Sequence, residues 1–137
     1  GDNSVAYGVN ANASGYNAFA FGTGAIACGN DAFAFGVRAV ALGDDSFAFG
    51  DSSRTTTSSV EGLATGDGAE TYAGDASAYG VGARAYAQNS YAYGTTSTAW
   101  SDHASAYGTN SNAHAVNSTA FGTESNAQSK NSMAQLC

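Results

Sequence analysis

Residues 32–50 read AFAFGVRAVALGDDSFAFG and contain the unit that organises the whole chain. A small residue, a variable residue, alanine, a second variable residue, usually glycine and two turn residues make one heptad, and the same unit begins again at residue 39 and at residue 46. The variable residues of alternate heptads resemble each other, so the detailed pattern repeats every fourteen residues. A repeat of this kind predicts a solenoid built by stacking copies of one short unit.

The heptads run without a break from Ser4 to Ser52 and resume at Gly62. Between them, residues 53–61 (SRTTTSSVE) number nine rather than seven. We call residues 53–61 the interruption and expect its two extra residues to bulge out as a surface loop. The sequence therefore predicts one continuous domain, with repeats over 1–52, the interruption over 53–61, and repeats over 62–137.

Within a heptad, positions one, three and five alternate with positions two and four, which is the two-residue period of a β-strand. Positions one and three hold almost only Ala, Ser or Gly, so two strands that face each other through these residues can pack closely. Consecutive fourteen-residue coils then pair in parallel. Gly at position five, and aromatic residues separated by one position, argue against a helical interpretation of so much alanine. We expect an all-β, flattened parallel solenoid in which each coil contributes two short strands.

In the first heptad of each coil, positions two and four hold twelve of the sixteen aromatic residues and none of the charged ones. Each aromatic side chain buries roughly 150–250 Å² when it is covered, so such a row exceeds the apolar patch that a soluble monomer usually exposes. We expect other copies of the chain to cover it in a closed cyclic assembly. We call this set the aromatic stripe: Tyr7, Phe19, Phe21, Phe33, Phe35, Phe47, Phe49, Tyr79, Tyr91, Tyr93, Tyr107 and Phe121.

Position four of the second heptad carries a second aromatic series, the aromatic ladder, which consists of Tyr72, Tyr86, Trp100 and His114. Glu70 and Arg84 are expected to stack beside it as a charge pair. One interpretation is a strip that binds a glycan or protein ligand; the other is a stabilising ladder or a contact with an adjacent chain. The interruption breaks a smooth rod and adds further candidate ligand residues, namely Arg54, Thr55, Thr56 and Thr57.

Composition excludes several classes of function. A formal net charge of −7, with only four Lys and Arg residues, argues against a nucleic-acid partner. There is no signal peptide, transmembrane run or lipidation motif, so we expect no membrane contact by this segment. No catalytic, cofactor-binding or metal-ligating pattern is present: His103 and His114 stand alone, and no helix pattern follows the GxGxxA match at residues 80–85. We therefore expect a protein that is not an enzyme.

The two cysteines do not predict a disulfide. Cys28 and Cys137 lie eight coils apart, which at about 4.8 Å per coil is roughly 38 Å and far beyond disulfide reach. We expect Cys28 to be a small packing residue. For Cys137, an added terminal residue and an inter-chain link are both open.

One motif resembles a known family. Asn3-Ser4-Val5-Ala6-Tyr7-Gly8, repeated as NSYAYG at residues 89–94 and NSTAFG at residues 117–122, is similar to the NSVAIG-x-x-S repeat of YadA-like heads in trimeric autotransporter adhesins. The resemblance covers the chain apart from the interruption. It implies a left-handed parallel β-roll, three chains around one axis, and extracellular display on a Gram-negative outer membrane.

The resemblance also implies a function, namely adhesion to host matrix proteins, cell-surface proteins or glycans. In this family the repeat is linked to collagen binding, which would place such a site at residues 3–8, 89–94 with Ser97, and 117–122 with Ser125. This chain has Phe or Tyr where the family usually has Val and Ile, which implies wider packing at the axis and leaves the ligand open. A phage or bacterial fibre on the same fold and a purely structural spacer remain alternatives. An ice-binding solenoid would need a regular Thr array on one face, which the second heptads lack.

Overall fold

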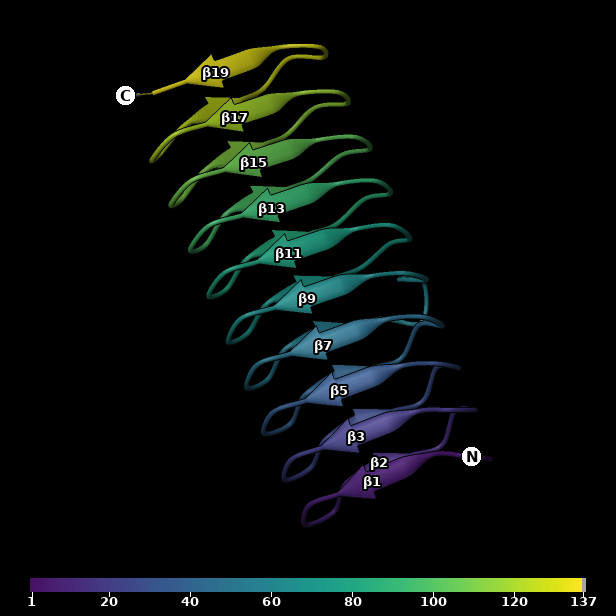
Figure 1. Ribbon diagram of the computed structural model, residues 1–137. Coiled ribbons are helices and arrows are strands. Elements are labelled where there is room, and N and C mark those ends of the chain that lie inside the picture. The colour runs from purple at the N-terminus through teal and green to yellow at the C-terminus, as the bar shows by residue number, and fades with distance from the viewer. Residues whose placement is uncertain (137) are drawn as a thin grey trace.

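The computed structural model describes residues 1–136, so Cys137 lies outside the described residues. These residues form short β-strands joined by tight turns, and no helix is present among them. The chain winds into a flat roll of stacked coils, with the two ends at opposite extremities (Figure 1). The predicted all-β parallel solenoid is confirmed.

Two parallel sheets face each other across the roll, one built from the first heptads and the other from the second. The ten-stranded sheet contains β1 (Val5–Tyr7), β3 (Phe19–Phe21), β5 (Phe33–Phe35), β7 (Phe47–Phe49), β9 (Leu63–Thr65), β11 (Ser77–Tyr79), β13 (Tyr91–Tyr93), β15 (Ser105–Tyr107), β17 (Thr119–Phe121) and β19 (Met133–Gln135). The nine-stranded sheet contains β2 (Asn12–Ala13), β4 (Ile26–Ala27), β6 (Val40–Ala41), β8 (Arg54–Thr55), β10 (Glu70–Thr71), β12 (Arg84–Ala85), β14 (Thr98–Ala99), β16 (Asn112–Ala113) and β18 (Asn126–Ala127).

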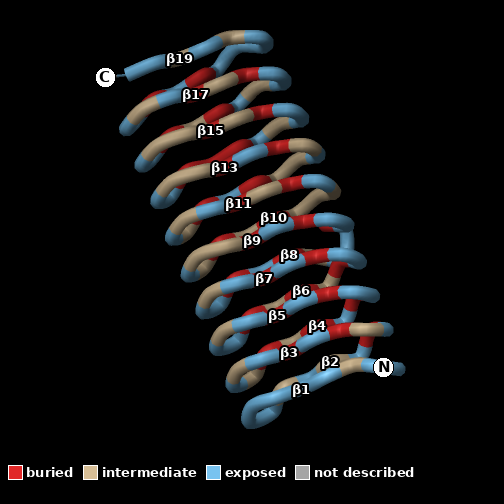
Figure 2. The backbone as a smooth tube through the Cα atoms, in the orientation of Figure 1, coloured by how far each residue is buried: buried red, intermediate tan, exposed pale blue. Residues whose placement is uncertain are grey.

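The interior consists of the small residues at positions one and three. Ala34 and Ala48 are 1% exposed and Ala92 is fully buried, and the same holds for the alanines at these positions in the coils between the two ends of the roll (Figure 2). Inward-facing serines satisfy their hydroxyl groups locally: Ser97 Oγ donates to the carbonyl oxygen of Gly94 at 2.9 Å. Because the inward residues are so small, the two sheets lie close together and large residues at positions two and four must point outward.

The turns between strands use a left-handed backbone at position seven of each heptad. Asn, Asp and Gly tolerate this conformation, but Arg38, Thr96 and His103 adopt it as well, with φ of 59°, 54° and 57°. In each case the backbone N–H donates to a carbonyl oxygen of the preceding coil, as Thr96 does to Val81 at 2.8 Å. Stacking of identical turns therefore imposes the conformation on residues that do not prefer it.

Within the interruption, only two residues depart from the regular roll. Arg54–Thr55 form β8, which pairs with β6 and β10 in the nine-stranded sheet. Glu61 takes the left-handed conformation of position seven, with φ of 56°. Only Thr57 and Ser58 are extra, and they form an exposed turn while the roll continues on either side.

Cys28 is not the packing residue that the sequence suggested. It occupies position four of a second heptad, directly after β4, and its side chain is exposed. The two-residue alternation points position four outward, whatever the size of the residue.

Candidate functional site

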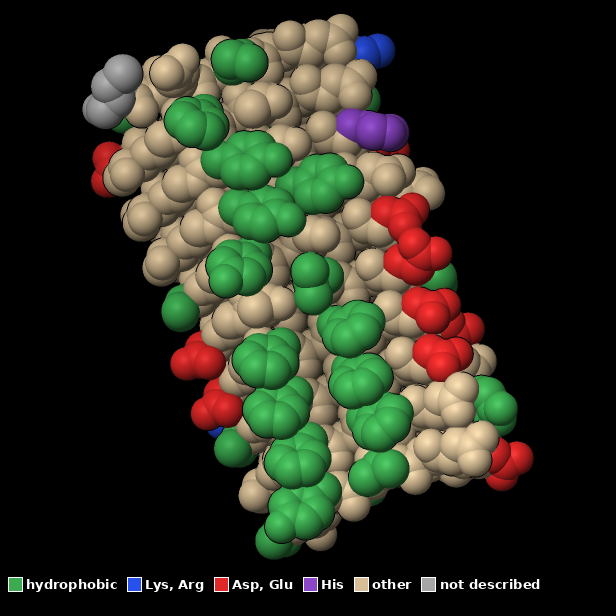
Figure 3. All heavy atoms as spheres, viewed as in Figure 1, with side chains coloured by type: hydrophobic (Ala, Val, Ile, Leu, Met, Phe, Trp, Pro, Cys, Tyr) green, Lys and Arg blue, Asp and Glu red, His purple; other side chains and the backbone are tan. Residues whose placement is uncertain are grey.

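The aromatic stripe lies on the outer face of the ten-stranded sheet, where hydrophobic side chains run in two columns and acidic side chains gather at the margins (Figure 3). Rings of consecutive coils stack nearly parallel, with centroids 4.6 Å apart for Phe19 and Phe33 and 4.9 Å for Phe35 and Phe49. Stacking covers only the ring faces, so Phe19 is still 37% exposed and Phe49 55%. This sheet presents an uncharged aromatic surface that a single chain does not cover.

The aromatic ladder lies on the outer face of the nine-stranded sheet, beside β10, β12, β14 and β16. Its rings form one continuous stack, with centroids 4.7 Å apart for Tyr72 and Tyr86, 4.5 Å for Tyr86 and Trp100, and 5.9 Å for Trp100 and His114. The planes of each pair lie within 12° of parallel. Each inner ring therefore has both faces covered by its neighbours, and the ladder offers ring edges and polar atoms to a partner.

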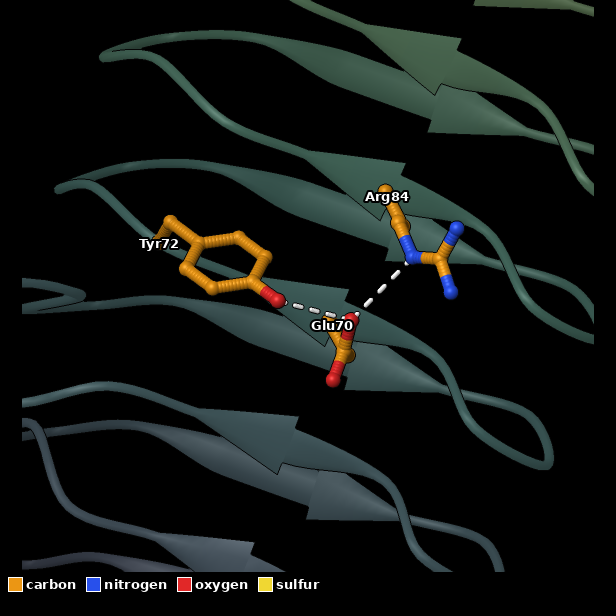
Figure 4. Close-up of polar contacts among 3 residues, drawn as sticks. All are labelled: Glu70, Tyr72 and Arg84. Atoms are coloured by element: carbon orange, nitrogen blue, oxygen red, sulfur yellow. Dashed lines mark hydrogen bonds and ion pairs between the residues drawn. The ribbon is translucent and has the colours of Figure 1, made fainter.

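A charged cluster flanks the lower end of the ladder (Figure 4). The Arg84 Nε donates to Glu70 Oε2 at 3.1 Å, and the Tyr72 hydroxyl donates to the same oxygen at 2.7 Å. The expected stacking of Glu70 and Arg84 is thus found in the structure, and Tyr72 joins it. Burial, together with the hydrogen bond to the Glu70 carboxylate, raises the pKa of Tyr72 to about 12. The hydrogen bond to Glu70 also raises the pKa of Arg84.

The candidate residues of the interruption divide between the surface and the interior. Arg54 is exposed on the sheet face and has no ion-pair partner within residues 1–136. Thr55 is fully buried and its hydroxyl donates to Ser46 Oγ at 2.9 Å, so it is unable to contact a ligand; the inward alternation of β8 decides this. Thr56 donates to the carbonyl oxygen of Tyr72 at 3.1 Å, and Thr57 is exposed in the extra turn.

Part of the interruption continues the columns of the sheet face that carries the ladder. Thr56 stands one coil below Tyr72, in the same column as the ladder, and Arg54 precedes Glu70 and Arg84 in the neighbouring column. Arg54, Thr56, Thr57 and the ladder share one sheet face, opposite the aromatic stripe.

Nearly every residue of the NSYAYG motif at residues 89–94 contributes to the structure of the roll. Asn89 supplies the left-handed turn with φ of 54°, and buried Ser90 donates to a carbonyl oxygen three residues earlier at 2.6 Å. Gly94 has φ of 135°, which favours glycine, and Ser97 donates to its carbonyl oxygen. The two tyrosines belong to the stripe. The motif therefore specifies the roll, and it presents no outward side chain other than its stripe tyrosines and the turn asparagine.

Residues 1–136 enclose no pocket and bring together no group of three His, Cys, Asp or Glu side chains suited to a metal ion. Nor does any helix in this range have the length and apolar character needed to cross a membrane.

The family model described as YadA head domain repeat matches residues 1–25, 27–53, 85–111 and 113–134. The chain belongs to the YadA head family. Among solved structures, this YadA-like head is similar to the crystal structure of the collagen-binding domain of Yersinia adhesin YadA, with a TM-score of 0.56 and 23% sequence identity. The similarity covers 98% of this chain and 80% of that one, and at this identity it shows the fold. A comparison with curated proteins finds no match.

Membership of the YadA head family gives the chain an adhesin-type function, on a fold that belongs to non-enzymatic adhesins. It also implies exposure at a bacterial surface. The unmatched residues 54–84 contain β8, the extra turn and the Glu70–Tyr72–Arg84 cluster, so the least typical part of the sequence coincides with one end of the candidate surface.

Proposed function

We propose that the chain is the head segment of a trimeric adhesin, displayed extracellularly on a Gram-negative outer membrane, and that it binds a matrix protein, a cell-surface protein or a glycan. The observation that carries the trimeric part is the aromatic stripe. Tyr7 is 66% exposed and Phe121 54%, and no charged residue shares the stripe. Aromatic surface of this extent requires a cover.

The exposed area is sufficient for a stable interface. The twelve rings would each bury roughly 150–250 Å² if fully covered, and most retain between a third and two thirds of their exposure. The stripe therefore offers on the order of 1,000 Å² per copy, more than the roughly 800 Å² per partner of a typical specific complex. Three copies around one axis would hide all three stripes and leave no open edge that could extend into a fibre.

With the stripe at the axis, the ligand surface is assigned to the opposite sheet. The aromatic ladder, Arg54, Thr56 and Thr57 all face outward there. Trp, Tyr and Arg are the residue types that most often dominate protein interfaces. Since the inner ring faces of the ladder are covered, a sugar ring would find an open face only at the two ends of the stack. This geometry favours a protein ligand over a glycan.

The test is binding of the fragment to immobilised collagen, fibronectin and laminin by surface plasmon resonance. The proposal predicts binding to at least one of them and at least a tenfold loss on Trp100→Ser. Val40→Thr, on the same sheet face but outside the ladder, is the matched control and should bind normally. Unchanged binding by the Trp100 variant, with a lower melting temperature, would show that the ladder only stabilises the roll. Failure to bind any matrix protein would favour a spacer or a fibre segment.

A further inference from the structure

The aromatic ladder connects an exposed indole to a hydrogen-bonded phenol. Trp100 is the one tryptophan of the chain and is 46% exposed, whereas Tyr86 and Tyr72 are half-buried. The ring centroids lie 4.5 Å apart for Trp100 and Tyr86 and 4.7 Å apart for Tyr86 and Tyr72. The three rings therefore form an unbroken stack that runs from a ring open to solvent toward rings that are more covered.

This order of rings favours electron transfer along the stack. Indole and phenol rings give up one electron to a strong oxidant far more readily than aliphatic or amide groups do. Trp100 is the most exposed of the three, so an oxidant in solution reaches it first. At neutral pH, a phenol that loses its proton together with the electron is easier to oxidise than an indole. An electron therefore passes from Tyr86 to the oxidised indole, and the electron vacancy moves away from Trp100.

Only one of the two tyrosines has a proton acceptor beside it. The Tyr72 hydroxyl donates to Glu70 Oε2 at 2.7 Å (Figure 4), whereas the Tyr86 hydroxyl has no hydrogen-bond partner within residues 1–136. The pKa of Tyr72 is raised to about 12, so at neutral pH this phenol keeps its proton until the ring is oxidised. Loss of an electron makes a phenol strongly acidic, and a base already in hydrogen-bond contact then takes the proton. Arg84 Nε, 3.1 Å from the same oxygen, holds that carboxylate in place.

The aromatic stripe shows that stacked rings alone do not make such a path. Its rings also stack, as Tyr93 and Tyr107 do at 5.5 Å. However, the stripe contains no indole at which an oxidant would enter, and no charged residue that could accept a proton. The ladder combines the two, with Trp100 at one point of the stack and Glu70 beside another.

We propose that the ladder is an electron-transfer path that moves one-electron oxidation from Trp100 through Tyr86 to Tyr72. A one-electron oxidant takes an electron from the Trp100 indole, and the indole recovers it from Tyr86. Tyr86 in turn takes an electron from Tyr72, whose phenolic proton passes to Glu70 Oε2. A small reductant such as ascorbate returns one electron to the Tyr72 radical, and the proton returns from Glu70. The path leaves Trp100 chemically unaltered; it goes beyond the proposed adhesion and does not depend on it.

Pulse radiolysis tests the path in a Cys28→Ser, Cys137→Ser background, which removes the competing thiols. The azidyl radical oxidises Trp100, and the absorbance bands of the tryptophanyl and tyrosyl radicals are followed separately. The tryptophanyl band should decay as the tyrosyl band rises, at a rate that does not depend on protein concentration. Tyr86→Phe keeps a stacked ring but is hard to oxidise, so it should slow this decay at least tenfold. Glu70→Gln keeps a hydrogen-bond acceptor of the same shape but no base, and should slow it at least threefold.

Tyr16→Phe is the matched control, because Tyr16 lies exposed in a turn outside the stripe and the ladder, and it should leave the decay unchanged. An equally fast decay in Tyr86→Phe, or a rate that rises in proportion to protein concentration, would overturn the inference. So would an unchanged decay in Glu70→Gln, because the path would then end at Tyr86. The two variants alter different residues, so either one remains a test if circular dichroism shows that the other is misfolded.

Peptide mass spectrometry after steady oxidation in the presence of ascorbate gives a second readout. Oxidised Trp100 should be at least threefold more abundant in Tyr86→Phe than in the parent chain, and should not increase in Tyr16→Phe. Equal oxidation of Trp100 in the parent chain and Tyr86→Phe would show that the ladder does not protect the indole. Neither measurement involves a ligand, so a failure to bind matrix proteins would count against the proposed adhesion and not against this path.

Discussion

Replacement of Gly36 by alanine tests the stacking of the coils most sharply. Gly36 occupies position five of a first heptad with φ of 137°, and a Cβ placed there would lie 2.5 Å from the carbonyl oxygen of Gly50 in the next coil. The clash is with backbone, so no side-chain rotation relieves it, and the Gly50 N–H to Phe35 carbonyl bond of 2.9 Å must open. Backbone strain alone costs about 1–3 kcal/mol. We expect a total loss of at least about 3 kcal/mol in the free energy of unfolding.

The assay is thermal unfolding followed by circular dichroism at one fixed protein concentration, because association couples stability to concentration. For a domain of this length, a loss of this size lowers the melting temperature by about 10 °C. Gly74→Ala is the matched control, since its Cβ would meet nothing closer than 3.8 Å and its φ is not positive. It should be neutral, or stabilising by up to about 1 kcal/mol. Gly36→Ala melting within about 3 °C of the wild type, or Gly74→Ala melting as early as Gly36→Ala, would refute the reasoning.

Three further outcomes are expected. Thr71 Oγ1 is buried without a hydrogen-bond partner in residues 1–136, so Thr71→Val should raise the free energy of unfolding in urea by about 1 kcal/mol. Thr55→Val removes the hydrogen bond to Ser46 and should lower the free energy of unfolding by about the same amount, so equal effects of the two substitutions would contradict the assignment. Trp100→Ser removes two stacking contacts and should lower the free energy of unfolding by about 1–2 kcal/mol in the same assay, while Trp100→Phe should retain most of this stabilisation. The pKa of Tyr72 is raised above its unfolded value of 10.0, so the contribution of Tyr72 to folding stability is complete below pH 10 and is lost as the pH rises through about 12. The phenolate absorbance that Tyr72→Phe removes should therefore appear near pH 12, and its appearance near pH 10 would count against the hydrogen bond to Glu70.

The architecture follows from the local sequence because every coil repeats the same pattern of small and large residues. Alternation of small and large residues determines which side chains face inward: Ala34 and Ala92 are buried, as predicted, and Phe49 is exposed, as predicted. The same alternation also explains the two residues whose predicted environment was wrong, Thr55 as a ligand residue and Cys28 as a packing residue. Thr55 is at an inward position and is buried, while Cys28 is at an outward position and is exposed.

Other features depend on contacts between coils and have no signal within a single heptad. Arg38 and Thr96 adopt left-handed turns because the coil below supplies a carbonyl acceptor, although neither residue prefers that conformation. Thr57 and Ser58 emerge as the extra pair only once Glu61 is seen in the position-seven conformation.

The central claim is that copies of the chain cover the aromatic stripe. The measurement that tests it most directly is the solution mass of the fragment by light scattering on a sizing column, over a wide range of concentrations. We expect the mass of three chains, and a shift toward the mass of one chain when Phe35→Asp places a charge in the stripe. A stable monomer of the unaltered chain would contradict the covering of the stripe by other copies. The stripe would then be an exposed surface, and the assignment of the ligand site to the opposite sheet would no longer follow.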